Sequence, residues 1–316
     1  MTAPLTYLIP WGYTVLLGLE GWRSPLLDNF FLFITEFGAE KFYIVLIAVM
    51  FWSISKPIAR KLSFIYLTSS VVNLYLKTIF AIPRPADPLN DEILSQNGII
   101  SRLDPLADEM SGSFPSNHAQ GSTVSWGYMA CAFGKRWLLF LSIVMIVLIG
   151  FSRMYIGVHY PQDVLAGWLI GLVYLVVWLK LEKPVMLLRD RIPWLVQLAV
   201  VVLVPFGLCL IAPVPEVDKV LGAIAGLGAG YILEAVYVKF SEHGRVPVRI
   251  LRSIVGLMLV FSVQIASKKI LAYTSQALPE HWEALVVSLM YMLTGFVAVF
   301  IVPWLFTIIK LAHRDV

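Results

Sequence analysis

Charge is scarce in this chain: 14% of its 316 residues are charged, whereas 59% are hydrophobic. A soluble domain carries about a quarter charged residues, so the composition excludes an ordinary soluble protein. Cysteine is scarce as well, and Cys131 and Cys209 both lie inside apolar runs. We expect free packing thiols and no disulfide. The net charge of +4 arises from basic residues scattered at the ends of apolar runs, which gives no indication of nucleic-acid binding.

Long apolar runs, by contrast, are abundant, and the mean hydropathy is +0.81. A helix needs about 20 apolar residues to cross the hydrocarbon core of a bilayer. The runs therefore predict an all-α polytopic membrane protein, a helical bundle of about nine spans. We expect these spans near residues 41–55, 61–80, 116–133, 136–153, 162–180, 193–212, 219–238, 252–267 and 284–307.

Three regions are expected along the chain. Residues 1–38 are apolar but short of a clear span, and they are broken by Pro10 and Gly12. They are predicted to form interfacial or re-entrant helices, and a true span at residues 5–20 stays open. Residues 39–182 contain the polar motifs described below and are predicted to form a transmembrane core. Residues 190–316 are predicted to add a C-terminal extension of four transmembrane helices.

The linkers between the predicted spans separate by charge. Basic loops stay in the cytoplasm, so the face that collects most of the 24 lysines and arginines is predicted to be cytoplasmic, together with the C-terminus. Those residues are Lys56, Arg60, Lys61, Lys135, Arg136, Lys180, Lys183, Arg189, Arg191, Lys239, Arg245, Arg249, Arg252, Lys310 and Arg314. Short linkers and the absence of an Asn-x-Ser/Thr site favour a bacterial inner membrane.

The rare polar residues within this apolar chain gather in three segments. "LKTIFAIPRP" contains Lys77 and Arg84, "FPSNH" contains Ser116, Asn117 and His118, and "FSRMYIGVHYPQD" contains Arg153, His159 and Asp163. All three segments fall on the face predicted to be extracytoplasmic. The charge bias that sets the topology does not use these motifs, so their common side is an independent indication of one shared site.

Such a set suits phosphate chemistry. Arginine offers bidentate hydrogen bonds to a phosphate and lysine offers a point charge. Pro115 is expected in the first turn of a helix, where the free backbone N–H groups of residues 116–118 would point at an anion. Asp163, four residues after His159, is placed to hold one imidazole nitrogen and leave the other as a nucleophile or base. The chain shows no Asp/His cluster at metal spacing, so the predicted chemistry needs neither metal nor cofactor.

These motifs resemble the three-part signature of the type 2 phosphatidic-acid phosphatase family, which includes lipid phosphatases, sphingosine-phosphate phosphatases, glucose-6-phosphatase and vanadium haloperoxidases. The resemblance lies in Lys77-x6-Arg84-Pro85, Pro115-Ser116-x-His118 and Ser152-Arg153-x5-His159-x3-Asp163. It implies that His159 forms a phosphohistidine, that Asp163 orients it and that His118 protonates the leaving group. Lys77, Arg84, Ser116 and Arg153 would bind the phosphoryl oxygens. The chain departs from the usual glycine at Asn117, whose backbone N–H or side chain would then face the substrate.

Four functions are compatible with these motifs. The leading interpretation is a phosphatase that acts on a membrane lipid phosphate or diphosphate at the outer leaflet. The alternatives are a sugar-phosphate phosphatase, a lipid phosphotransferase, and a lipid transporter or scramblase without enzymatic activity. In the C-terminal region, Gly222, Gly226 and Gly230 form a small-residue face. That face permits close helix packing, either within the chain or in a homodimer.

Overall fold

The computed structural model of the chain describes residues 6–85, 112–212, 214, 216–274 and 280–315. Within these residues the chain forms helices, with one isolated bridge between Phe240 and Arg314. The all-α prediction is confirmed. The α-helices are α1 (Ile9–Glu20), α2 (Pro25–Glu36), α3 (Glu40–Ser53), α4 (Lys56–Phe80), α6 (Asn117–Phe133), α7 (Arg136–Tyr155), α8 (Pro161–Arg189), α9 (Trp194–Ile211), α10 (Val217–Leu233), α11 (Val246–Thr274), α12 (Glu280–Phe296) and α13 (Val302–Ile308).

Each predicted span coincides with a helical segment. Short π-helical turns, η3 (Glu234–Val238) and η4 (Val297–Ile301), extend α10 and join α12 to α13. Seven segments of the described chain are long and apolar enough to cross a membrane. The other two, α3 with 14 residues and α6 with 17, are shorter. At 12 residues each, α1 and α2 are shorter than the length needed to cross a bilayer, which favours the prediction of interfacial or re-entrant helices for residues 1–38.

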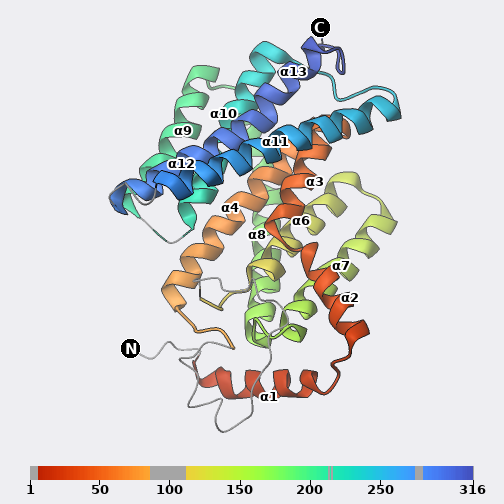
Figure 1. Ribbon diagram of the computed structural model, residues 1–316, viewed down its shortest axis with the longest axis vertical. Coiled ribbons are helices and arrows are strands. Elements are labelled where there is room, and N and C mark those ends of the chain that lie inside the picture. Colours follow the sequence, from red (N-terminus) through yellow and green to blue (C-terminus); the bar gives the residue numbers. More distant parts are fainter. Residues whose placement is uncertain (1–5, 86–111, 213, 215, 275–279, 316) are drawn as a thin grey trace. The chain divides into compact units, whose positions relative to one another are not determined.

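The chain divides into two compact units (Figure 1). The first unit contains residues 1–43 and 72–180, and the second contains residues 44–71 and 181–316. This division differs from the expected regions in two respects. The N-terminal helices belong to the same unit as the polar motifs, and most of α3 with the first part of α4 groups with the C-terminal helices.

In the first unit, α8 packs closely against α6. Gly167 and Gly171 of α8 lie one and two turns after Asp163, on the same helix face. A Cβ at Gly167 would lie 2.7 Å from the carbonyl oxygen of Ser116, and a Cβ at Gly171 would lie 2.8 Å from Cβ of Thr123. Glycine is therefore required for this approach, which brings the first turn of α8 next to the start of α6.

A buried amide joins α4 to α6 in the same unit. Asn73 is fully buried, and its Nδ2 donates to Oε1 of Gln120 at 2.8 Å and to the carbonyl oxygen of Pro115 at 3.3 Å. Lys77 lies one turn after Asn73 on α4. The Asn73 bonds therefore fix the end of α4 against the beginning of α6.

In the second unit, the small-residue face of α10 is covered by α12. A Cβ at Gly222 would lie 2.2 Å from the carbonyl oxygen of Ser288, and a Cβ at Gly226 would lie 2.0 Å from that of Met292. At Gly230 the nearest atom is a side-chain carbon of Val299, at 2.5 Å. The face is therefore used within the chain, and a homodimer through these glycines is not supported.

A buried ion cluster also belongs to the second unit. The carboxylate of Glu234, with a side chain 0% exposed, accepts from Nζ of Lys56 at 2.9 Å and from Nη2 of Arg60 at 2.5 Å. It also accepts from the backbone N–H of Phe240 at 3.1 Å. These bonds tie the beginning of α4 to the π-helical end of α10.

Candidate active site

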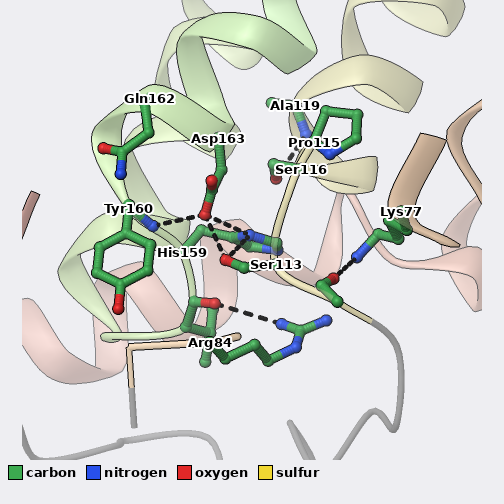
Figure 2. A network of polar contacts seen from close by, with 12 residues as sticks. Lys77, Arg84, Ser113, Pro115, Ser116, Ala119, His159, Tyr160, Gln162 and Asp163 are labelled. Carbon is green, nitrogen blue, oxygen red and sulfur yellow. Dashed lines mark hydrogen bonds and ion pairs between the residues drawn. The ribbon is translucent and has the colours of Figure 1, made fainter. Parts of the chain in front are cut away.

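The three polar motifs meet in the first unit, at the ends of four helices. Lys77 lies in the last turn of α4, and Arg84 follows that helix. His118 lies in the first turn of α6, Arg153 in the last turn of α7, and Asp163 in the first turn of α8. His159 lies in the short connection between α7 and α8. Figure 2 shows Lys77, Arg84, His159 and Asp163 around the segment that leads into α6.

The centre of the site is a buried His–Asp pair. His159 is 2% exposed and Asp163 is 0% exposed. Nδ1 of His159 lies 3.4 Å from Oδ2 of Asp163, and the same oxygen accepts from the backbone N–H of Tyr160 at 2.8 Å. When Nδ1 carries a proton directed at the carboxylate, Nε2 keeps its lone pair for attack.

A third side chain joins this pair. Ser113 is fully buried, and its hydroxyl donates to Oδ2 of Asp163 while Oγ lies 3.4 Å from Nδ1 of His159 (Figure 2). The motif signature does not include Ser113, and sequence reasoning missed it. The signal for it in the sequence was a hydroxyl directly before the segment FPSNH, three residues before Ser116.

Three buried cationic side chains surround the histidine. Lys77, Arg84 and Arg153 are 4%, 5% and 3% exposed. Each is held by an oxygen acceptor: Nζ of Lys77 donates to the carbonyl of Gly112 at 2.5 Å, and Nη1 of Arg84 donates to that of Val158 at 3.3 Å. Nη1 of Arg153 donates to Oγ1 of Thr35 at 2.8 Å.

Burial and nearby positive charge both act on the ionisation of His159. Burial lowers the pKa of His159 well below 6.5, and Arg84, Lys77, Arg153 and His118 lower it further. Like charges disfavour the imidazolium. His159 is therefore neutral at physiological pH, which is the state in which an imidazole nitrogen can attack, and the surrounding positive charge suits a dianion.

The start of α6 differs from the expectation. The helix begins at Asn117, with Ser116 as N-cap, so Pro115 precedes the cap and does not occupy the first turn. Oγ of Ser116 accepts from the backbone N–H of Ala119 at 3.5 Å. The backbone N–H of Ser116 donates to the carbonyl of Asp163 at 3.0 Å. The expectation that this N–H is free for an anion is wrong, because it joins α6 to α8.

Asn117 and His118 occupy the first turn of α6, where backbone N–H groups lack intrahelical partners. Oδ1 of Asn117 is buried and has no hydrogen-bond partner among the described residues. His118 packs closely against Gly38, since a Cβ at Gly38 would lie 2.8 Å from Cδ2 of the imidazole. Asn117 and His118 therefore lie with the other motif residues, and their roles stay predictions.

The described residues contain no group of three or more His, Cys, Asp and Glu side chains suited to hold a metal ion. The donors that gather at the site are cations, two imidazoles and one carboxylate. Such a donor set matches an anionic ligand better than a divalent cation.

Comparison with known proteins identifies the family. Residues 58–186 match the PAP2 superfamily, and residues 219–314 match the transmembrane extension of PAP2 superfamily phosphatases. The chain thus carries a PAP2 superfamily domain followed by that extension, and it is a multi-pass integral membrane protein. The predicted family, the type 2 phosphatidic-acid phosphatases, is confirmed.

Curated relatives of the chain have lipid substrates in their names. An undecaprenyl-diphosphatase of Sulfolobus acidocaldarius is 30% identical over 46% of this chain and 66% of that protein. Sphingosine-1-phosphate phosphatase 1 of Mus musculus is 25% identical over 88% of this chain and 71% of that protein. A solved PAP2-type phosphatidylglycerolphosphate phosphatase from Bacillus subtilis is 22% identical, with a TM-score of 0.46 over 57% of this chain and 88% of that one. The chain spans less than two thirds of the first of these relatives.

Proposed function

We propose that the chain is an integral membrane phosphatase that removes the terminal phosphate of a membrane lipid phosphate or diphosphate. The reaction passes through a phosphohistidine on His159 and needs no metal. The observation that supports this most directly is the buried His159 beside Asp163, with the buried cations Lys77, Arg84 and Arg153 in the same unit. A nucleophile, an orienting carboxylate and a set of cationic donors are what phosphoryl transfer requires.

The proposed chemistry has two steps. In the first, Nε2 of His159 attacks phosphorus, the bond from phosphorus to the lipid oxygen breaks, and His118 gives a proton to the leaving alkoxide. In the second, His118 takes a proton from water as the water oxygen attacks phosphorus, the bond from phosphorus to Nε2 of His159 breaks, and inorganic phosphate leaves. Asp163 stabilises the positive charge that develops on the His159 ring in the first step. Lys77, Arg84, Arg153 and the N–H groups at the start of α6 stabilise the phosphoryl oxygens.

A lipid substrate is favoured over a sugar phosphate. The named relatives act on an undecaprenyl diphosphate or a sphingosine phosphate, and a Bacteroides thetaiotaomicron relative, 26% identical over 50% of this chain, is a lipid A 4'-phosphatase. A site at the ends of membrane helices would meet the headgroup of a lipid that stays in the bilayer.

The test of this function is phosphate release by the detergent-purified chain from a panel of lipid monophosphates, lipid diphosphates and sugar phosphates. We expect release from a lipid substrate and acid-labile phosphate on the wild-type protein during turnover. His159→Ala should fold and release almost none. Normal turnover by a folded His159→Ala protein would exclude the mechanism, and release from sugar phosphates alone would exclude the lipid assignment.

We further propose that the site opens to the extracytoplasmic face of a bacterial inner membrane, with the C-terminus in the cytoplasm. The basic linkers support this orientation. Single cysteines in place of Gly21, between α1 and α2, and of His243, between η3 and α11, test it in a background without Cys131 and Cys209. An impermeant maleimide on intact cells should label the Gly21→Cys protein and leave the His243→Cys protein unlabelled. The reverse pattern would move the site to the cytoplasmic face.

A further inference from the structure

The end of α2 contacts two of the motif residues although it lies upstream of all three motifs. Thr35, in the last turn of α2, is 4% exposed, and its Oγ1 accepts from Nη1 of Arg153 at 2.8 Å. Gly38 follows the helix and is buried against His118. Its N–H donates to the carbonyl of Thr35 at 2.9 Å, so one short turn presents both residues.

Other contacts fix α2 to the helix that carries Arg153. The hydroxyl of Tyr155 donates to Oδ1 of Asp28 at 2.7 Å, and Nη2 of Arg23, just before α2, donates to the carbonyl of Tyr155 at 3.2 Å. The rings of Phe31 and Tyr155 lie 4.3 Å apart between centroids. Helix α2 is therefore docked along the end of α7, which makes the Thr35–Arg153 contact part of a packed interface.

We infer that the turn from Thr35 to Gly38 positions the phosphate-binding and acid groups of the site, an inference that rests on the proposed function. Thr35 is a positioning residue for the guanidinium of Arg153. An arginine presents its donors in a planar fork, so an acceptor that holds one nitrogen sets the direction of the remaining donors. A guanidinium held in place before the substrate arrives loses less freedom when it binds a phosphoryl group.

Gly38 acts on His118 by its lack of a side chain. A Cβ there would lie 2.8 Å from Cδ2 of His118 and 2.6 Å from Cγ2 of Ile149. Contacts that short force a neighbour to move; Ile149 is fully buried, and His118 is partly buried. The imidazole is therefore confined between Gly38 and the body of the unit, and any larger residue at position 38 displaces the proposed proton donor.

Thr35 is tested with two substitutions that separate the hydroxyl from the packing. Thr35→Val keeps the shape and removes the acceptor, whereas Thr35→Ser keeps the acceptor and removes a methyl group. If Thr35 positions Arg153, Thr35→Val should raise both KM for the lipid phosphate and the inhibition constant of vanadate by at least about tenfold. This is the scale of a hydrogen bond to a charged group. The kcat of the Thr35→Val protein should change less than its KM. Thr35→Ser stays within about threefold of wild type, since the acceptor is retained.

Gly38→Ala is compared with Gly18→Ala, because a Cβ added at Gly18 of α1 would meet nothing within 4 Å. Gly38→Ala should lower kcat about tenfold or more for a lipid alkoxide leaving group, which is the scale of a positioned proton donor. The fall in kcat should be smaller for a p-nitrophenyl ester, whose leaving group needs no proton. Gly18→Ala should match wild type on both substrates. Equal losses on the two substrates would overturn the role of Gly38.

Vanadate binding to the purified chain, measured by its thermal stabilisation, separates this inference from the proposed function. If wild type binds vanadate but hydrolyses no lipid phosphate, the proposed function is excluded. The vanadate affinities of Thr35→Val and Thr35→Ser then still test the positioning role of Thr35. Vanadate affinity of Thr35→Val equal to wild type would overturn the role of Thr35. So would a Thr35→Ser protein as impaired as Thr35→Val, because packing alone would then account for the loss.

Discussion

The Ser113 hydroxyl is the feature of the site whose removal has the most direct expected effect. It donates to Oδ2 of Asp163, the oxygen that also faces Nδ1 of His159. In Ser113→Ala that carboxylate oxygen keeps the backbone N–H of Tyr160, at 2.8 Å, and the imidazole. A hydrogen bond to a charged group contributes about 1.5–3 kcal/mol. Since about 1.4 kcal/mol corresponds to a factor of ten in rate, kcat should fall about 10- to 100-fold.

The assay is single-turnover formation of acid-labile phosphoprotein, followed by steady-state kcat and KM. Ser113 holds Asp163 and none of the three cations, so we expect KM to change little. Ser142→Ala is the matched control: Ser142 is 1% exposed in the same unit, and its hydroxyl donates to the carbonyl of Trp126 at 2.9 Å. It should lower stability by about 1 kcal/mol and leave kcat unchanged.

Two results would refute this reasoning. One is a Ser113→Ala protein with kcat within twofold of wild type. The other is a faster Ser113→Ala protein, which would mean that the hydroxyl competes with His159 for the carboxylate oxygen, as the 3.4 Å spacing of Oγ and Nδ1 would permit. A double variant with Asp163→Ala adds a check: residues that act as one unit are not additive, so Ser113→Ala should cost little once Asp163 is gone.

Four further outcomes follow from the site and the fold. His118→Ala should slow hydrolysis of lipid alkoxide esters at least about 100-fold while p-nitrophenyl esters lose far less; equal losses would remove the acid assignment. The pKa of His159 lies below 6.5, so protonation of this nucleophile should reduce kcat/KM only below pH 6.5, after correction for substrate ionisation; a His159-dependent limb above pH 7 would contradict its neutral state. EDTA should leave hydrolysis intact and vanadate should inhibit it, whereas activity restored by Mg²⁺ after EDTA would contradict the metal-free mechanism. Glu234→Gln weakens the ion pairs with Lys56 and Arg60, so it should cost up to about 3–5 kcal/mol of stability and leave kcat of the folded protein unchanged; an unchanged melting temperature would contradict that role.

The helices were predictable because a bilayer imposes a strong constraint on sequence. Apolar runs of limiting length, separated by charged linkers, locate all nine segments, although α4, α8 and α11 extend beyond their predicted bounds by five to nine residues. The motif residues were predictable as a group for a related reason. Buried polar residues are costly in an apolar chain, so Lys77, Arg84 and Arg153 stand out against their surroundings without any three-dimensional information.

What the sequence did not predict depends on contacts between distant residues. Thr35 and Arg153 are 118 positions apart, and a threonine in an apolar helix has no local pattern that marks a partner. The Gly222–Gly226–Gly230 pattern predicts close packing but not which helix provides the packed surface, so packing within the chain and a homodimer were both compatible with it. The N–H of Ser116 illustrates the same limit, because only the close approach of α8 through Gly167 makes the carbonyl of Asp163 its acceptor.

The division of the chain bears on what the C-terminal extension does. Every residue proposed to react, to bind the phosphate or to position these groups, from Thr35 to Asp163, belongs to the first unit, whereas the Glu234 cluster and the glycine face of α10 belong to the second. The extension therefore supplies no group to the reaction as proposed. Two helices nevertheless belong to both units: α4 carries Lys56 at its start and Lys77 in its last turn, and α8 carries Asp163 in its first turn.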